Sequence, residues 1–408
     1  MKLPWLFARR YLVSKKSTNA INVISAVSGL GMFVGSLGLV LVLSVFNGFQ
    51  HLVEGLYSTF TAPVVILPST GKTFMCNDSL LQKIKAVPHV AHYSRVIEEN
   101  ALLRWKENQD IATVKGVDDN YAQLTGVDSS LWDGDFQLMK DSVPMAIVGV
   151  GIQQKLRMSL DDPGGVLSIY MPRKGKKIYF NPMDAFNTAA VGVSASFAIQ
   201  QDFDTRYVLV PFTLAQQLTG NYNKVSSIEI MTDDAMHEQQ VIDALGKMFG
   251  RNLIIKNRFQ QNDTLYKVMR TEKWAVYAIL TFILIVAAFN MIGSLSMLVI
   301  EKRKDISILK TMGASEGLIK NIFLGSGMLL SMLACVAGFI VAVILILLQQ
   351  HFGFIQIGGA SFVVSAYPVR MQWQDFVLVF TTVAIIGSIA SWLPAIRAAK
   401  NELRMKEE

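Results

Sequence analysis

The segment of this sequence that comes nearest to a cofactor motif is a partial phosphate-binding loop. The residues Ser69-Thr-Gly-Lys-Thr73 follow the apolar stretch 64–67, as a Gly-Lys-Thr tripeptide follows a strand in nucleotide-binding proteins. The complete motif requires a glycine five positions before Gly71, and this chain has Ile66 there. We therefore expect no nucleotide site in this segment.

Histidines and cysteines are the other residues that could do chemistry. The histidines are His51, His89, His92, His237 and His351. His89 and His92 are three residues apart, but no acidic or thiol partner is evident nearby, so a solvated loop is favoured over a metal site. Cys76 and Cys335 lie in segments of different character, which argues against an intrachain disulfide, and Cys76 is expected to be a packed thiol. We predict a chain with no catalytic residues, no metal ligands and no cofactor of its own.

Four long segments of the chain lack charged side chains, and such segments are stable in an apolar solvent. Hydrophobic residues make up 51% of the 408 residues and charged residues 17%, with a mean hydropathy of +0.37. Soluble domains carry about 25% charged residues, and a helix needs roughly 20 residues to cross the hydrocarbon core. The charge-free runs predict four transmembrane helices, at residues 21–49, 273–300, 321–349 and 376–396.

The first of these segments follows a basic leader, as the core of a signal peptide does. We interpret it as a retained helix, because its apolar stretch is roughly twice as long as a signal-peptide core of about 7–15 residues. Residues 1–20 are predicted to be cytoplasmic, with a short amphipathic helix on the membrane surface at Trp5–Leu12. The four predicted spans carry no buried Asp, Glu, Lys or Arg, since Lys273 stands at the very edge of its span, although ion-coupled carriers usually keep such a residue within the bilayer. The energy for any work is therefore expected to come from a partner.

The distribution of charge predicts the orientation. Residues 1–20 carry a net charge of +5, residues 301–320 carry +2, residues 397–408 carry +1, and the rest of the chain carries −1. Segments with an excess of Lys and Arg stay in the cytoplasm, so these three segments and both termini are predicted inside. Residues 50–272 and the loop 350–375 are predicted outside. The pI of 9.2 thus reflects topology and not nucleic-acid binding.

The predicted outside domain has mixed patterns. Strands are expected at residues 64–67, 111–117, 166–170, 191–199, 207–211, 225–231 and 252–256, and helices at 77–85, 214–218 and 235–249. This order indicates an α+β domain. The predicted fold class is therefore an α-helical membrane protein with four transmembrane helices and an α+β extracytoplasmic domain inserted between the first and the second.

The segment Glu301–Ser315, between the second and third spans, predicts a short helix at the inner membrane surface. Ile306, Leu309 and Met312 recur at i, i+3 and i+6 and give it an apolar stripe among basic residues, and Gly313 would end it. Such a stripe suits insertion into a groove on another protein. Periodicity alone leaves a stripe that faces the membrane equally consistent.

Several segments carry a family resemblance. Glu301-Lys-Arg-Lys-Asp-Ile-Ser-Ile-Leu-Lys-Thr-Met-Gly-Ala314 resembles the signature of the FtsX/MacB-type ABC transporter permeases, in which it forms the coupling helix that docks on the ATPase. Segments similar to the LolC/LolE branch are Arg10-Tyr-Leu12, Leu43-Ser-Val-Phe-Asn-Gly-Phe49 and Val286-Ala-Ala-Phe-Asn-Met-Ile-Gly-Ser-Leu295. The resemblance extends to the span order, to a MacB-type periplasmic core domain, and to the short tail after 394–399.

The resemblance implies a multi-pass protein of the bacterial inner membrane that is not itself an enzyme. It would be the permease subunit of an ABC transporter that extracts lipoproteins and hands them to a periplasmic LolA-type carrier. A LolD-type ATPase dimer would bind ATP and Mg, and a second permease subunit would form a homodimer or a LolC/LolE-type heterodimer. The alternatives are a MacB-like efflux or mechanotransmission permease, an FtsX-like signalling scaffold without transport, and a membrane receptor outside the ABC class.

The resemblance also assigns roles to residues. The ATPase-coupling residues would be Glu301, Lys304, Ile306, Leu309, Lys310, Gly313 and Ala314. A carrier-binding hook corresponds by position to residues 172–186, with Pro172, Arg173, Lys174, Lys177, Tyr179, Phe180, Pro182 and Phe186 as its basic, aromatic and turn residues. An ordinary hairpin loop is the alternative to the hook.

The first span and the residues after it contribute candidate residues for two further roles, which are contact with acyl chains and helix packing. Residues expected to contact acyl chains in a lipid or substrate cavity are Val45, Phe46, Phe49, Leu52 and Leu56, with simple burial in the bilayer as the alternative. Gly31 and Gly35 form a GxxxG pair that permits close helix packing, and a contact between subunits is favoured.

Overall fold

The computed structural model describes residue 7 and residues 19–160, 162, 164–173, 182–250, 252–356 and 366–400. The chain forms two compact units. Within the described residues, the first combines residues 19–52, 267–356 and 366–400 with residue 7, and the second lies within residues 53–266. Most of the predicted amphipathic segment 1–20 lies outside the described residues, and within it Phe7 is helical.

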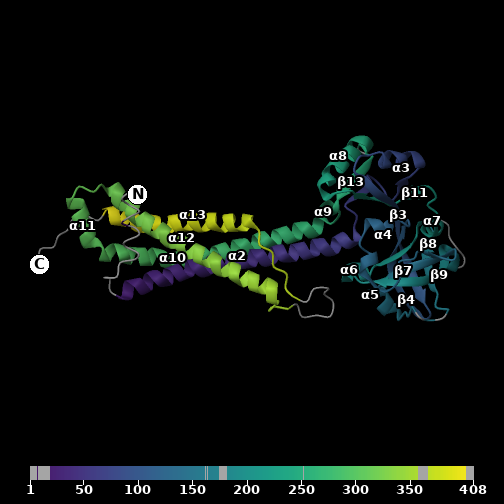
Figure 1. The fold of residues 1–408 in the computed structure, drawn as a ribbon, viewed down its shortest axis with the longest axis horizontal. Coiled ribbons are helices and arrows are strands. Elements are labelled where there is room, and N and C mark those ends of the chain that lie inside the picture. The colour runs from purple at the N-terminus through teal and green to yellow at the C-terminus, as the bar shows by residue number, and fades with distance from the viewer. Residues whose placement is uncertain are drawn as a thin grey trace. The chain divides into compact units, whose positions relative to one another are not determined.

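Four long helices are apolar enough to cross a membrane (Figure 1). They are α2 (Asn19–Phe60), α10 (Asp263–Glu301), α12 (Glu316–Phe352) and α13 (Trp373–Lys400). Each contains one predicted span and continues beyond it. The predicted class with four transmembrane helices is confirmed.

Small side chains let the helices of the first unit approach closely. A Cβ atom at Gly31 would lie 3.1 Å from Cβ of Ala287, and one at Gly35 would lie 2.5 Å from Cδ1 of Leu284. Both neighbours belong to α10 of the same chain. Within one chain the GxxxG pair therefore packs against α10, and the contact between subunits that the sequence analysis favoured stays a prediction.

The second unit is built on a mixed sheet with the strand order β13-β1-β12-β3-β4-β10-β7-β9-β5, in which β8 also pairs with β3 and β9, and β6 with β7. The bounds are β1 (Val64–Pro68), β3 (Val90–Trp105), β4 (Asn108–Val117), β5 (Leu131–Gly134), β6 (Met139–Lys140), β7 (Val143–Gly149), β8 (Leu167–Pro172), β9 (Phe186–Phe197), β10 (Tyr207–Pro211), β12 (Ser227–Thr232) and β13 (Leu253–Asn257). The β4–β10 and β7–β9 pairs are parallel, whereas the other pairs are antiparallel. A separate small ribbon joins β2 (Phe74–Met75) and β11 (Lys224–Val225).

Short helices complete this unit, as the predicted α+β class requires. They are α3 (Asp78–Lys85), α4 (Tyr121–Leu124), α5 (Val150–Leu156), α6 (Gln201–Asp204), α7 (Phe212–Thr219), α8 (Glu238–Phe249) and α9 (Arg258–Gln261), with the 3-10 turns η1 (Asp128–Ser130), η2 (Pro182–Ala185) and η3 (Ala235–His237). The sequence leaves Asn77 or Asp78 as the residue that begins this helix, and the structure selects Asn77, whose side chain accepts a hydrogen bond of 3.0 Å from the Leu80 amide.

Each face of the sheet carries its own hydrophobic core, since side chains alternate along a strand. On β10, Val208 and Val210 belong to the larger core, whereas Leu209 between them belongs to the smaller one. The smaller core also contains Phe60, the last residue of α2, and Tyr121 of α4. The end of the first long helix is thus part of the folded interior of the second unit.

Candidate functional site

The predicted coupling segment forms a helix, α11 (Arg303–Thr311), between α10 and α12. Its apolar side chains point in different directions. Ile306 is 4% exposed and belongs to the hydrophobic core of the bundle, and Leu309 is half-buried. Ile308 and Met312, by contrast, are 57% and 78% exposed. The sequence analysis placed Ile306, Leu309 and Met312 on one apolar stripe and left open whether it faces a partner or the membrane. In the structure Ile306 packs into the bundle, whereas Ile308 and Met312 are exposed, and the coupling role of these residues stays a prediction.

Polar contacts also hold α11 against the bundle. The Nζ atom of Lys310 donates a hydrogen bond of 2.9 Å to the carbonyl oxygen of Ala399, near the end of α13. Gly313 follows the helix with φ of 88°, and the Ser315 side chain then begins α12 by accepting from the Leu318 amide. Of the other predicted coupling residues, Lys304 is exposed, while Glu301 and Ala314 are half-buried.

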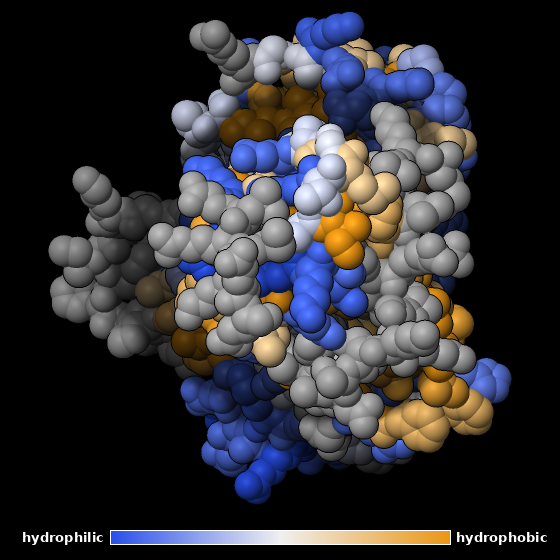
Figure 2. Space-filling view, turned by 90° about the vertical axis from the view of Figure 1, so that its left-hand side faces the viewer, coloured by the Kyte–Doolittle hydropathy of each residue, from blue (hydrophilic) through white to orange (hydrophobic). Residues whose placement is uncertain are grey.

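Figure 2 looks onto the end of the bundle that carries α11, and hydrophilic and strongly apolar residues lie side by side there. Protein-binding surfaces combine such apolar anchors with polar neighbours. This end can therefore offer another protein two exposed apolar side chains on a helix that is fixed to α13.

A buried polar triad joins three membrane helices. Asn47 of α2 donates through Nδ2 to Oδ2 of Asp375 on α13, and the Nζ atom of Lys273 on α10 lies 2.8 Å from Oδ1 of Asn47 and 3.2 Å from Oδ1 of Asp375. Asp375 is only 5% exposed. The sequence analysis placed Asp375 and Lys273 at the edges of charge-free runs and missed their pairing. The available signal was an acid and a base at the same predicted membrane surface.

The candidates for acyl-chain contact lie along α2. Val45 and Phe46 are half-buried, Phe49 is 39% exposed, and Leu52 and Leu56 are half-buried. Leu52 is the last residue of α2 that belongs to the first unit, whereas Leu56 belongs to the second. The stretch therefore offers a partly accessible apolar surface, and its role in binding acyl chains stays a prediction.

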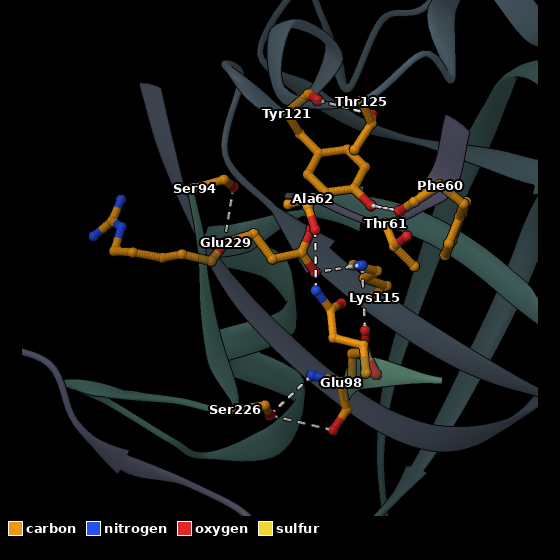
Figure 3. Close-up of polar contacts among 12 residues, drawn as sticks. Phe60, Thr61, Ala62, Ser94, Glu98, Lys115, Tyr121, Thr125, Ser226 and Glu229 are labelled. Carbon is orange, nitrogen blue, oxygen red and sulfur yellow. Dashed lines mark hydrogen bonds and ion pairs between the residues drawn. The ribbon is translucent and has the colours of Figure 1, made fainter. Parts of the chain in front are cut away.

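The second unit contains a buried ion pair beside the end of α2. Lys115 on β4 and Glu229 on β12 are 3% and 6% exposed, and Nζ of Lys115 lies 2.7 Å from Oε1 of Glu229. Glu98 on β3 lies 3.4 Å from the same Nζ atom. Figure 3 shows Lys115 among these carboxylates, with Tyr121 and Phe60 close by. The ammonium group stands 4.9 Å from the centre of the Phe60 ring and 5.0 Å from that of Tyr121, which is within range of cation–π attraction.

The electrostatics of this pair follow from its burial. Desolvation alone would lower the pKa of Lys115, but the neighbouring Glu229, Tyr121 and Glu98 outweigh it and hold that pKa well above its usual value. Burial raises the pKa of Glu229, and the Lys115 ammonium opposes that rise. Lys115 is therefore a cation at neutral pH whose charge is balanced inside the sheet, so that either partner alone would be costly to bury.

The points where the chain enters and leaves the second unit are tied to each other, and we call this set of contacts the outer clamp. The carbonyl oxygens of Thr61 and Ala62, just after α2, accept hydrogen bonds from Nε of Arg258 at 3.3 Å and Nε2 of Gln261 at 3.0 Å. Gln261 lies two residues before α10. The hydroxyl of Tyr121 donates to the Phe60 carbonyl at 3.2 Å. The outer ends of two membrane helices are thus held together by the folded domain.

The predicted hook is described only at its base. Pro172 of β8 pairs with Phe186 of β9, and Nε of Arg173 donates a hydrogen bond of 2.9 Å to Oδ1 of Asn187. Lys174, Lys177, Tyr179 and Phe180 lie outside the described residues, as does the side chain of Pro182. The flanking strands predicted around this segment are confirmed as β8 and β9.

The sequence analysis assigned no function to residues 69–73, Cys76 or His89, and the structure shows what each of them contacts. After β1, residues 69–72 form bends and not the start of a helix, which a phosphate-binding loop requires, and Lys72 pairs with Glu99 at 2.8 Å. Cys76 is half-buried, and burial raises the pKa of its thiol, as expected of a packed residue. His89, however, contacts residues distant in sequence, Asp233 and His237, and the sequence analysis missed this cluster because it searched only near neighbours.

Comparisons with known proteins cover almost the whole chain. Residues 277–403 match the FtsX-like permease C-terminal model, and residues 25–248 match the MacB-like periplasmic core domain model. The chain is 22% identical to the lipoprotein-releasing system transmembrane protein LolE of Haemophilus influenzae, with 98% of each chain covered. It is 24% identical to LolC of Xylella fastidiosa, covering 96% of this chain and 95% of that one. It is also 22% identical to the macrolide export ATP-binding/permease protein MacB of Acinetobacter baylyi, covering 94% of this chain but 57% of that protein.

Proposed function

This chain belongs to the FtsX/MacB type of ABC transporter permeases, inner-membrane proteins of bacteria with a periplasmic domain, and from that premise we propose that it extracts lipoproteins from the inner membrane. In this proposal it passes them to a periplasmic LolA-type carrier and draws its energy from a separate ATPase. Both termini and α11 lie in the cytoplasm, as the excess of basic residues indicates.

The lengths of the relatives support the lipoprotein-releasing assignment. The chain matches the LolE and LolC relatives over 95–98% of their length, whereas it spans 57% of the longer relative whose name includes both an ATP-binding and a permease function. The match is thus to a permease whose name carries no ATP-binding part. This supports an ATPase supplied as another subunit.

The observation that carries the proposal is the continuity of α2 and α10. α2 extends for 42 residues from the membrane span to Phe60, and α10 begins two residues after Gln261. The outer clamp fastens these two ends, while at the inner end α11 is attached to α13 through Lys310. We infer that a displacement applied near α11 reaches the periplasmic domain along α2 and α10, which have residues in both units, and that this needs no catalytic residue in this chain.

Extraction of a lipid-anchored protein requires such work. Each buried CH₂ group contributes roughly 0.8 kcal/mol to membrane anchoring, so several acyl chains together hold a protein by tens of kcal/mol. Exposed apolar side chains along the outer half of α2, such as Phe49, could take over part of this contact as the chains leave the bilayer.

The proposed partners follow from the same surfaces. A LolD-type ATPase dimer binds α11 through Ile308 and Met312, which are exposed, together with the basic side chains around them. A LolA-type carrier binds the segment 172–186, and a second permease subunit, either identical or of the LolC/LolE type, completes the complex. ATP and Mg are bound by the ATPase and not by this chain.

The second candidate function is MacB-like efflux or mechanotransmission. The match to the macrolide exporter over 94% of this chain favours it, and the transmission pathway through α2 and α10 would be the same. The two functions differ in what leaves the membrane and in what receives it.

Depletion of the protein from its own cells separates these functions. We expect outer-membrane lipoproteins to accumulate in the inner membrane within a few generations, because their acyl chains are not released spontaneously. Membranes would be separated by density, and lipoproteins detected by labelling with radioactive palmitate. Re-expression of the wild-type chain should restore sorting. If lipoproteins reach the outer membrane normally while the sensitivity to macrolides rises, the efflux function is correct and the proposed one is not.

A further inference from the structure

Three potential metal-ligating side chains meet in the second unit, and we call them the His-Asp cluster: His89, Asp233 and His237. Nδ1 of His89 lies 2.9 Å from Oδ2 of Asp233, and Nδ1 of His237 lies 2.9 Å from Oδ1 of the same carboxylate. The two imidazole rings stack at 3.8 Å between centroids with an angle of 26°. Two ring nitrogens are thus directed at the two oxygens of one carboxylate.

The backbone holds these residues in place. Val90 at the start of β3 pairs with Thr232 at the end of β12, so the next residues outward, His89 and Asp233, are adjacent. The Asp233 amide donates a hydrogen bond of 3.1 Å to the His89 carbonyl. His237 follows four residues later at the end of η3, a turn that the Asp234 side chain begins by accepting from the Met236 amide. The cluster is therefore set by strand register and a capped turn.

The donor set matches a transition-metal ion. Ligand atoms from the three residues all lie within 4.8 Å of one another. Bonds of about 2.0–2.2 Å to a tetrahedral ion separate ligand atoms by roughly 3.4 Å, so only a small displacement admits the ion. Two neutral imidazoles and a carboxylate suit zinc and its neighbours in the first transition series, whereas magnesium and calcium prefer oxygen ligands alone.

Charge and exposure favour the same ligand. Asp233 supplies a carboxylate whose two oxygens both lie within hydrogen-bond distance of the imidazoles, so the site offers an anionic ligand to a cation. The side chains of His89, Asp233 and His237 are 35%, 48% and 31% exposed, which gives an ion access from solvent. Water or another donor could fill the fourth position of a tetrahedral site.

We propose that His89, Asp233 and His237 bind one transition-metal ion, with zinc as the best match to the ligands. The bound ion would join the turn before β3 to η3 and so to the start of α8. This proposal concerns the folded domain alone and is independent of whether the permease releases lipoproteins.

Metal titration of the full-length chain in detergent tests this site. The chain would carry a purification tag without histidine, and Co²⁺ would be added while the visible absorption of tetrahedral or five-coordinate cobalt is recorded. Zn²⁺ would then be titrated by calorimetry. We expect one ion per chain, and because even outer-shell changes weaken metal sites by about 10–100-fold, His237→Ala and Asp233→Asn should each weaken binding by at least about tenfold.

The matched control is His92→Ala, because His92 is an exposed histidine of β3 outside the cluster, and it should bind the ion as the wild type does. Circular dichroism of each variant would verify that the domain remains folded. Failure of the folded wild type to bind Co²⁺ or Zn²⁺ at one ion per chain would overturn the proposal. So would equal binding by a folded variant in which all three residues of the cluster are replaced.

Discussion

The double substitution Ile308→Glu/Met312→Glu is expected to abolish association with the ATPase subunit while the permease still inserts and folds. Both side chains are largely exposed on or directly after α11, so two carboxylates there do not disturb the bundle, whereas Ile306 beside them is buried. Apolar anchors at the centre of an interface each contribute roughly 2 kcal/mol or more. Loss of two such anchors, with two carboxylates in their place, should weaken binding by more than about 100-fold. Co-purification from detergent-solubilised membranes measures this directly.

The matched control for this pair is Ile111→Glu. Ile111 is 70% exposed but lies on β4 of the other unit, so its replacement should leave the ATPase bound. A complex that survives Ile308→Glu/Met312→Glu with the wild-type amount of ATPase would show that the partner docks elsewhere. In that case the assignment of α11 as the coupling element is wrong.

Substitution of Lys115 by Met is expected to destabilise the periplasmic domain by about 3–5 kcal/mol, because it leaves the buried carboxylate of Glu229 without its cation. For a domain of this size that corresponds to a fall of roughly 10 °C in the midpoint of thermal unfolding. The outer clamp would loosen as well, since Lys115 packs over the rings of Phe60 and Tyr121. Thermal unfolding of the full-length chain in detergent, followed by near-UV circular dichroism, measures the change.

Two further variants test whether the unpaired charge of Glu229 causes this loss of stability. The double variant Lys115→Met/Glu229→Leu removes both charges and should recover much of the lost stability, since apolar residues often replace a buried ion pair without cost. Lys155→Met is the surface control, because Lys155 is 52% exposed and pairs with Asp110 at 3.1 Å. Exposed pairs contribute about 1 kcal/mol or less. If Lys115→Met shifts the midpoint no more than Lys155→Met does, the buried pair does not stabilise the domain as we infer.

Much of the fold could be predicted from the sequence because its strongest signals are local. A run of apolar residues as long as 321–349 is most stable as a helix in the hydrocarbon core of a membrane, and α12 forms over these residues. Strands with short apolar alternation, such as β1 and β10, were predicted for the same reason. The strand β3 was missed because polar and charged residues such as Glu98 and Glu99 interrupt its pattern. It forms because it pairs with β4, β8 and β12, which are contacts between distant segments.

The candidate site was less predictable, since its contacts depend on tertiary packing. The sequence predicts a helix at α11, but it does not reveal that Ile306 turns inward while Ile308 faces outward. The pairings of Lys115 with Glu229, and of Asp375 with Lys273, each join residues more than 100 positions apart. Periodicity carries no signal for such pairs.

The measurement that tests the central claim most directly is release of a lipoprotein in a reconstituted system. The permease and its ATPase would be placed in liposomes with a palmitate-labelled lipoprotein, and soluble carrier of the LolA type would be added with ATP. We predict that label appears in the supernatant bound to the carrier, that it requires both ATP and carrier, and that Ile308→Glu/Met312→Glu abolishes it. Label that stays in the liposomes while the intact complex hydrolyses ATP would contradict the account.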